Sequence, residues 1–283
     1  MLKVCGLTKQ YGNTYAIRDV SFTAKDGEII GLVGHNGCGK STTMNIITGY
    51  IAPTSGSVFI DDVDCIQNPR FAREKIGYLP ETPPLYPDLT VNEQLSFAAG
   101  LRGIKDSESA ISSACEKADV SAVRRRLIRN LSKGYRQRVG LAQALLGDPA
   151  IIILDEPSNG LDPQQISEMR NIIRSESTSR TILLSSHVLS EVELLCDRLV
   201  ILSNGTVSAN GTIDELKHMC KASDSFEIDI KGTSDPELLR SQIEASGWQV
   251  NGIREATPSL ESVFMRLTSD ERYQKEAKNE RSD

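Results

Sequence analysis

Residues 34–42 of the chain read Gly34-His35-Asn36-Gly37-Cys38-Gly39-Lys40-Ser41-Thr42. This stretch matches G-x-x-x-x-G-K-[ST], the P-loop that cradles nucleotide phosphates. The run before it, 28–33, is typical of a short buried strand, and the run from 41 to 47 is typical of the start of a helix. Because strand, glycine-rich turn and helix is the setting that this motif needs, we favour phosphate binding over a plain strand-to-helix turn with an exposed lysine.

The chemistry of this loop follows from its backbone and from three side chains. Its glycines let successive N–H groups point at anionic oxygens, and the helix N-terminus adds partial positive charge. We expect Lys40 to reach the terminal phosphates and Ser41 to ligate Mg²⁺ through its hydroxyl. Two roles stay open for Cys38: a reactive thiol whose pKa the helix N-terminus lowers, or a small side chain that fills space.

The composition restricts the class of protein. The chain has 283 residues, enough for one large domain or for one domain with an appendage. Its net charge of −6 disfavours a general nucleic-acid or anionic-membrane surface. No apolar run approaches the roughly 20 residues of a membrane span, and the N-terminus lacks the apolar core of a signal peptide. The six cysteines are scattered without a C-x-x-C pair, which argues for reduced thiols in the cytosol rather than a metal site or a disulfide framework.

The N-terminal half contains strands and then a helical region. Residues 2–7 and 16–23 alternate apolar and polar side chains, as half-buried strands do. Tyr11 lies in the loop between them and is either a surface aromatic or a platform that stacks on a flat ring. From 90 to about 140 the pattern is helical and begins with a capping box. The basic run 124–129 is more readily a solvated helix face than a nucleic-acid patch, since the chain is acidic overall.

Two adjacent carboxylates follow the most apolar strand. The run 150–154 is typical of a strand covered on both faces, and it ends in Asp155 and Glu156. Open α/β sheets bind ligands at this end of their strands. Asp155 is suited to hold Mg²⁺, and Glu156 is suited to accept a proton from an attacking water. The alternative is a plain turn, but the P-loop upstream favours chemistry, and His187 closes the next buried strand.

The C-terminal region has a different pattern. Residues 226–230 and 248–250 are typical of strands, and 235–245 and 259–267 of helices, so we expect a small α+β appendage. Residues 270–283 are almost wholly charged and polar, so we expect a frayed helix or a disordered tail. The expected organisation is a nucleotide-binding domain over 1–219 with a helical subdomain at about 82–148, an accessory domain over 220–268, and a charged tail over 269–283.

Taken in order, these segments resemble the ATP-binding cassette (ABC) ATPases over roughly residues 2–218. The resemblance is carried by the P-loop, by Leu131-Ser132-Lys133-Gly134-Tyr135, by the Asp155-Glu156 strand, by 158–162 and by His187. It implies an α/β fold: a P-loop NTPase core with an N-terminal antiparallel β subdomain and an inserted helical subdomain. It also implies that two cassettes sandwich two ATP molecules head to tail.

The resemblance further implies individual roles. Tyr11 would stack on adenine, and the P-loop from Gly34 to Thr42 would bind phosphates and Mg²⁺. Ser132 and Gly134 would hold the γ-phosphate of the nucleotide on the opposite protomer, as suits a residue that begins a helix. Glu156 would be the catalytic base and His187 would contact the γ-phosphate, while Asp162 would communicate across the dimer.

Two positions depart from the family pattern. The signature usually reads L-S-G-G-Q, and here Lys133 and Tyr135 replace its first glycine and its glutamine. The loop position usually held by glutamine is Glu81, whose carboxylate can ligate Mg²⁺ as an amide oxygen does but with a different charge. Residues 81–101 would also face the membrane partner.

The function that follows is an ATP-binding and ATP-hydrolysing subunit of a membrane exporter, of the branch that serves drugs, polysaccharides or gliding-type systems. Its partners would be a separately encoded integral membrane permease and a second cassette, identical or different, with no nucleic acid. The protein would be cytoplasmic and peripheral on the inner face of the cell membrane. The alternative is a soluble ABC ATPase that acts on the ribosome or DNA, which the single cassette and the lack of sustained heptads disfavour. A GTPase is disfavoured because no N-K-x-D motif is present.

Overall fold

A computed structural model describes residues 1–219, 226–228 and 253–255 of the chain. It divides into two units, Met1–Thr212 and Ile213–Asp283, which are described separately below. In the described residues, no helix combines the length and the apolar character needed to cross a membrane.

The first unit begins with a four-stranded antiparallel sheet in the order β2-β1-β4-β5. Its strands are β1 (Leu2–Tyr11), β2 (Thr14–Ala24), β4 (Ser55–Ile60) and β5 (Val63–Asp64). The antiparallel subdomain is confirmed, but the first two strands are longer than expected. Tyr11 pairs with Thr14 and therefore ends β1 instead of lying in a loop, because the hairpin closes over only two residues.

The second sheet has six strands in the order β10-β9-β3-β8-β7-β6. Strands β6 to β9 and β3 run parallel, and β10 is the antiparallel partner of β9. All residues of β3, β7 and β8 are buried, as expected for strands covered on both faces. The bounds are β3 Ile29–Val33, β6 Ile76–Leu79, β7 Ile151–Asp155, β8 Thr181–Ser185, β9 Arg198–Ser203 and β10 Thr206–Thr212.

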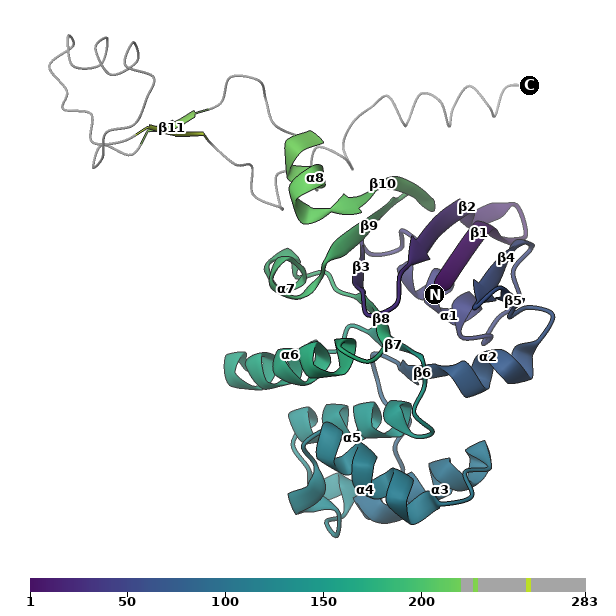
Figure 1. Cartoon of the computed structure of the whole chain (residues 1–283), viewed down its shortest axis with the longest axis vertical. Helices are drawn as coiled ribbons and strands as arrows, with labels where there is room; N and C mark the ends of the chain where they lie inside the picture. Colours follow the sequence, from purple (N-terminus) through teal and green to yellow (C-terminus); the bar gives the residue numbers. More distant parts are fainter. Residues whose placement is uncertain (220–225, 229–252, 256–283) are drawn as a thin grey trace, which may run out of the picture. The chain divides into compact units, whose positions relative to one another are not determined.

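Helices cover both faces of this parallel sheet (Figure 1). On one face α1 (Lys40–Ile47) lies in the hydrophobic core between the two sheets, and α2 (Pro69–Lys75) precedes β6. On the other face lie α6 (Pro163–Ser177) and α7 (Leu189–Leu195). Because β3, β7 and β8 are adjacent and parallel, the segments that follow them emerge at one edge of the sheet.

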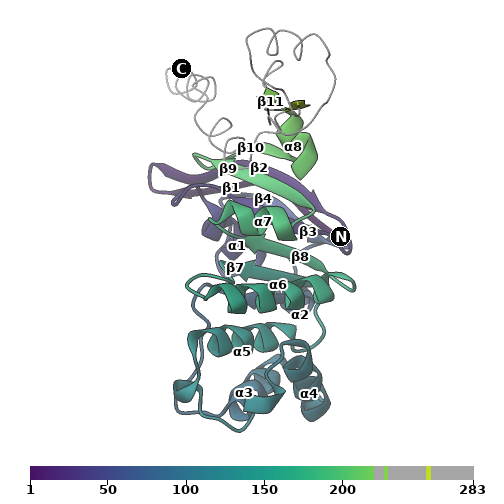
Figure 2. The same ribbon diagram turned by 90° about the vertical axis from the view of Figure 1, so that its left-hand side faces the viewer.

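The region expected to be helical from 90 to about 140 contains three separate helices, α3 (Val91–Arg102), α4 (Ser107–Lys117) and α5 (Lys133–Leu145). They lie together in Figure 2. The predicted capping box of Thr90 and Glu93 is confirmed at the start of α3. The helical region is confirmed, as is the helix that Ser132 was expected to begin. The region is interrupted because Gly103 ends α3 in a left-handed conformation and the chain later turns through η1 (Ser121–Val123) and η2 (Ile128–Asn130).

The second unit has α8 (Ile213–Met219) and two short strands, β11 (Phe226–Ile228) and β12 (Ile253–Glu255), which pair antiparallel. The strand predicted at 226–230 is thus observed in part. The elements predicted at 235–245, 248–250 and 259–267, and the charged tail, lie outside the described residues. The domain boundaries given by the sequence remain predictions.

Candidate functional site

The P-loop connects β3 to α1 and requires glycine at position 39. Gly39 has a φ of 105°, and a Cβ there would lie 2.3 Å from Cγ2 of Ile17 and 2.8 Å from the carbonyl oxygen of Ala16. Both the left-handed backbone and the close approach of β2 exclude a larger residue. Gly39 is also the N-cap of α1, and no side chain caps this helix. The N-terminus of α1 is therefore suited to bind an anion.

Lys40 is 7% exposed and folds back over the loop. Its Nζ donates to the carbonyl oxygens of Gly34 at 2.7 Å and His35 at 3.3 Å. These two residues and Cys38 do not line the pocket that the loop borders, whereas Lys40 does. Lys40 thus borders a pocket of about 430 Å³, to which the loop contributes Asn36, Gly37, Gly39, Lys40, Ser41 and Thr42.

The opposite wall of this pocket comes from the ends of β6, β7 and β8. The side chains there are those of Glu81, Asp155, Glu156, Asn159 and His187. They are distant in the sequence and converge because their strands are neighbours in the parallel sheet. A lysine and a helix N-terminus on one wall and carboxylates on the other suit a polyanion that arrives with a cation.

Ser185, at the end of β8, bonds to the Asp155 carboxylate and to the backbone of Glu156. Its Oγ donates to Oδ1 of Asp155 at 2.6 Å and accepts the backbone N–H of Glu156 at 3.0 Å. Ser185 was not among the residues predicted from sequence motifs. The only signal for it was that it ends a buried strand, as Asp155 does, and the two residues prove to be paired across β7 and β8.

Glu156 has a φ of 49°, an uncommon conformation for a residue with a side chain. Its Oε2 lies 2.7 Å from Nδ1 of His187 and accepts the backbone N–H of the same residue at 3.4 Å. Such strained positions persist only where the surrounding structure holds them and are concentrated at functional sites. The geometry presents the Glu156 carboxylate to the pocket with an imidazole beside it.

The oxygen atoms of the pocket suit a divalent cation bound together with phosphates. Ser41, Glu81 and Asp155 offer a hydroxyl and two carboxylates, and Asp155 is 8% exposed with a hydroxyl as its hydrogen-bond partner. Among the described residues, no group of three or more His, Cys, Asp or Glu side chains forms a preformed metal cage. This donor set fits Mg²⁺, which keeps waters and phosphate oxygens as ligands and takes only a few from the protein.

The structure does not bring every predicted site residue to this pocket. Tyr11 is 53% exposed at the end of β1, with Nζ of Lys9 at 5.1 Å from its ring centroid, and it does not line the pocket. Ser132 is the N-cap of α5, where its Oγ accepts the N–H of Tyr135 at 3.3 Å. Ser132 and Gly134 line a different pocket of about 300 Å³ together with Asp162. One chain therefore gathers only part of the predicted set around Lys40.

Cys38 corrects one hypothesis. Burial raises the pKa of the Cys38 thiol above its ordinary value and outweighs the positive charge of Lys40, which acts in the opposite direction. Its sulfur lies 2.3 Å from the position that a Cβ on Gly34 would occupy. The prediction of a lowered pKa for Cys38 is therefore wrong. Burial destabilises the thiolate by more than the helix N-terminus stabilises it. The observed environment favours the alternative, a small side chain that fills the loop.

We expect thiol reagents to modify Cys38 slowly in the native protein. The thiolate is the reacting form, and each pKa unit of increase lowers its fraction about tenfold at neutral pH. The alkylation rate should rise with pH and stay below that of the partly exposed Cys5 between pH 7 and 8. Timed iodoacetamide labelling with mass spectrometry of both peptides measures this, and faster labelling of Cys38 than of Cys5 would contradict it.

A phosphate loop at a helix N-terminus, with paired carboxylates on the neighbouring strands of a parallel sheet, defines a P-loop nucleotide triphosphatase. Similarity to known proteins identifies the family within this class. The family model described as ABC transporter matches residues 17–159. The bacitracin transport ATP-binding protein BcrA of Bacillus licheniformis is 38% identical over 219 residues, which cover 77% of this chain and 71% of that protein. The chain belongs to the ABC transporter family.

A solved dimeric cassette and a much longer protein are also similar to this chain. The dimeric structure of MJ0796, a bacterial ABC transporter cassette, matches with a TM-score of 0.68 at 26% identity over 75% of this chain and 99% of that one. ABC transporter A family member 1 of Dictyostelium discoideum is 32% identical, but this chain spans only 28% of its length. The predicted family and fold are confirmed, and the chain is an ATP-binding and ATP-hydrolysing cassette that acts with membrane components.

Proposed function

We propose that this chain powers a membrane exporter through a permease on a separate polypeptide and that it lies on the inner face of the cell membrane. The observation that carries the chemistry is the convergence of Lys40, Asp155, Glu156 and His187 on one pocket. The resemblance to BcrA, a bacitracin transport ATP-binding protein matched over 71% of its length, supports transport in preference to action on ribosomes or DNA.

In the proposed mechanism, Glu156 accepts a proton from the water that attacks the γ-phosphorus. The bond between this phosphorus and the oxygen that bridges to the β-phosphate breaks, and ADP and phosphate leave. Lys40 and the N–H groups at the start of α1 stabilise the charge on the phosphate oxygens. His187 holds Glu156 through Nδ1, at 2.7 Å, and offers its other ring nitrogen to the γ-phosphate.

Mg²⁺ would be held by Ser41, Glu81 and Asp155, and when bound it would neutralise charge on the transferring phosphoryl group. Ser185 contributes by holding the Asp155 carboxylate through its hydroxyl at 2.6 Å. Tyr11 is placed at the adenine only by resemblance. Its exposure leaves the ring accessible to a base, and Ala16, on the paired strand β2, borders the pocket.

A second cassette would supply the groups that one chain lacks around its own pocket. Ser132 and Gly134 line a separate pocket, so they can reach the γ-phosphate only of a nucleotide held by another copy or by a different cassette. The likeness to a dimeric cassette supports this arrangement. Asp162, the N-cap of α6, lines the same separate pocket and would face the partner.

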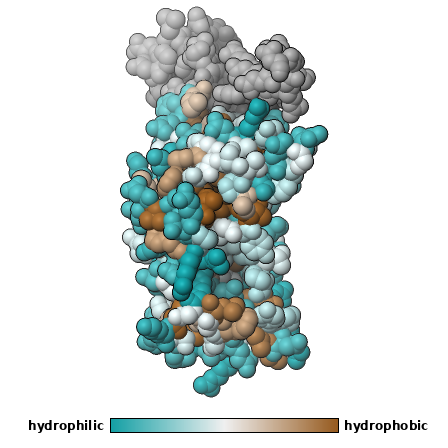
Figure 3. All heavy atoms as spheres, turned by 90° about the vertical axis from the view of Figure 1, so that its right-hand side faces the viewer, coloured by the Kyte–Doolittle hydropathy of each residue, from teal (hydrophilic) through white to brown (hydrophobic). Residues whose placement is uncertain are grey.

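The permease would dock on the face formed by residues 81–101. Phe97 and Leu101, four residues apart on α3, are 46% and 74% exposed, and Tyr86 packs edge-on against Phe97 with ring centroids 5.6 Å apart. Hydrophobic residues gather at the lower end of the face drawn in Figure 3, over the helical part of the chain. Such a patch on a surface is typical of an interaction site.

We expect the double variant Phe97→Ser, Leu101→Ser to detach the protein from membranes of its own cells and to leave ATP binding unchanged. The exposed apolar side chains would lose their contact with the permease, while the nucleotide pocket lies elsewhere. Cosedimentation with membranes and with ribosomes, compared with Leu194→Ser on α7 as a control, measures this. Recovery of the unmodified protein with ribosomes rather than membranes would overturn the transport proposal.

A further inference from the structure

Glu81 and Asn159 form a wall between two cavities. Both line the nucleotide pocket, and both line a neighbouring groove of about 500 Å³ bounded by residues 82–87 and 128–137. Nδ2 of Asn159 donates to Oε1 of Glu81 at 2.8 Å. The sequence analysis assigned no role to Asn159, yet this amide contacts a carboxylate that it did assign to the metal.

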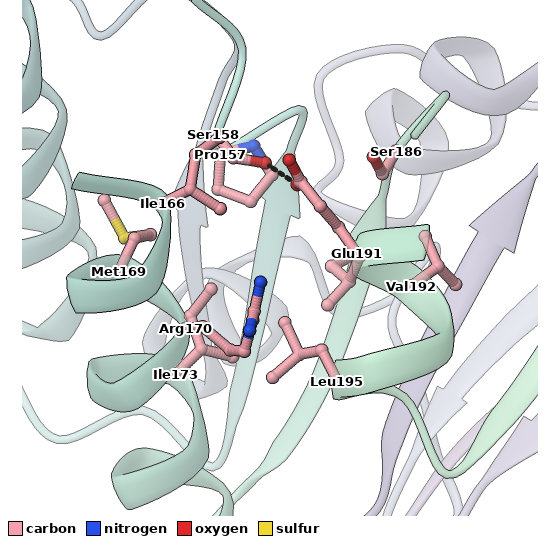
Figure 4. A pocket seen from close by; sticks show the side chains of 11 residues that line it. Pro157, Ser158, Ile166, Met169, Arg170, Ile173, Ser186, Glu191, Val192 and Leu195 are labelled. Atoms are coloured by element: carbon pink, nitrogen blue, oxygen red, sulfur yellow. Dashed lines mark hydrogen bonds between the residues drawn. The ribbon is translucent and has the colours of Figure 1, made fainter. Parts of the chain in front are cut away.

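The backbone on both sides of Asn159 is held in place. The preceding Ser158 donates its hydroxyl to Glu191 on α7, the contact drawn as a dashed line in Figure 4. The following Gly160 has a φ of 69°, and Nζ of Lys133 lies 2.3 Å from the position that a Cβ there would occupy. The Asn159 amide thus projects from a segment that α7 and α5 constrain.

Asn159 is also tied to the residues that face the substrate. Its backbone N–H donates to the carbonyl oxygen of Glu156 at 3.1 Å. Since its side chain holds Glu81, Asn159 links the backbone of Glu156, after β7, to the Glu81 carboxylate, after β6. A hydrogen bond to one carboxylate oxygen leaves the other available to a cation, and partners of this kind orient metal ligands and tune their affinity.

We propose that Asn159 is a positioning residue for Glu81. Its amide holds Oε1 so that Oε2 meets the divalent cation that accompanies the bound nucleotide. This role matters more for a glutamate than for a neutral amide, since a free carboxylate on an exposed loop can turn to solvent or to the cation Lys133 across the groove. The inference rests on the proposed assignment of Glu81 as a metal ligand.

The test uses Mn²⁺ as the probe and the full chain in a Glu156→Gln background, in which hydrolysis is removed. Titration of Mn²⁺ into protein with saturating ATP, followed by electron paramagnetic resonance, measures the affinity for the metal. We expect Asn159→Ala and the shape-conserving Asn159→Leu each to weaken it about tenfold. In a Glu81→Ala background the same changes should alter the affinity for Mn²⁺ less than about twofold. Without the Glu81 carboxylate, Asn159 has nothing to position, so the two effects are not additive.

Asn210→Ala is the matched control, because this side chain accepts from Arg198 at 2.6 Å and lies outside both cavities. Melting temperatures of all variants show whether each one folds. The positioning role of Asn159 would be overturned by an unchanged affinity for Mn²⁺ in Asn159→Ala. It would also be overturned by an equal loss of affinity with and without the Glu81 carboxylate. Neither result would affect the proposed metal site. Failure of the parent to bind Mn²⁺ with ATP would overturn the proposed metal site as well.

Discussion

Glu156→Gln is expected to lower ATP turnover by at least about 100-fold, the typical contribution of a general base. The amide keeps the shape of the side chain but cannot accept the proton of the attacking water. ATP binding should persist, since Lys40 and the start of α1 are unchanged and the pocket loses one negative charge. Phosphate release measures turnover, and calorimetric titration with ATP measures binding.

The same variant should accumulate an ATP-bound dimer, because the nucleotide that joins the two cassettes is no longer hydrolysed. Gel filtration with light scattering, with and without ATP, measures this. Glu74→Gln is the matched control, since Glu74 is exposed on α2 and pairs with Arg70 at 3.5 Å. Turnover of Glu156→Gln at the unmodified rate would remove Glu156 as the base.

Lys40→Met is expected to weaken ATP binding about 100-fold, from the roughly 3 kcal/mol typical of losing a buried charged contact. Methionine keeps much of the length of the lysine stem but removes the ammonium that the loop holds at the border of the pocket. The phosphates would then face only the backbone N–H groups and the helix N-terminus. Calorimetric titration of ATP in the presence of Mg²⁺ measures the change.

Folding provides the control for this variant. The Lys40 ammonium is buried and bonds to two carbonyl oxygens. Removing it relieves the cost of burying a charge, which offsets the loss of these hydrogen bonds. The melting temperature without ATP should therefore stay close to that of the unmodified protein. Lys117→Met, on α4 and paired with Asp148, should retain ATP binding. Unchanged affinity in Lys40→Met would exclude Lys40 as a phosphate ligand.

Several features of the site were predictable because they are local. The spacing of Gly34, Gly39 and Lys40 specifies a loop whose backbone conformation depends on near neighbours. The apolar run before Asp155 and Glu156 specifies a buried strand, so both carboxylates had to lie at its end. The capping box at Thr90 was predictable for the same reason, since it involves residues three positions apart.

Other features were not predictable because they depend on contacts between distant segments. The order of β3, β8 and β7 places Ser185 between Asp155 and Glu156, and no local pattern reveals this order. The burial of Cys38 reversed the expected direction of its pKa, because desolvation depends on everything packed around the thiol. The break between α3 and α4 was not predicted, since a helical period does not show where a chain turns.

The sequence by itself determined the class of this protein, the order of its elements and most of the side chains that we propose carry its chemistry. The tertiary structure decided which of those side chains meet: His187 with Glu156, Asn159 with Glu81, and Ser132 in a pocket separate from that of Lys40. The physical reason is the distance along the chain over which each interaction acts. Glycine conformation, hydrophobic period and capping act over a few residues, whereas strand order and burial arise from packing of the whole domain.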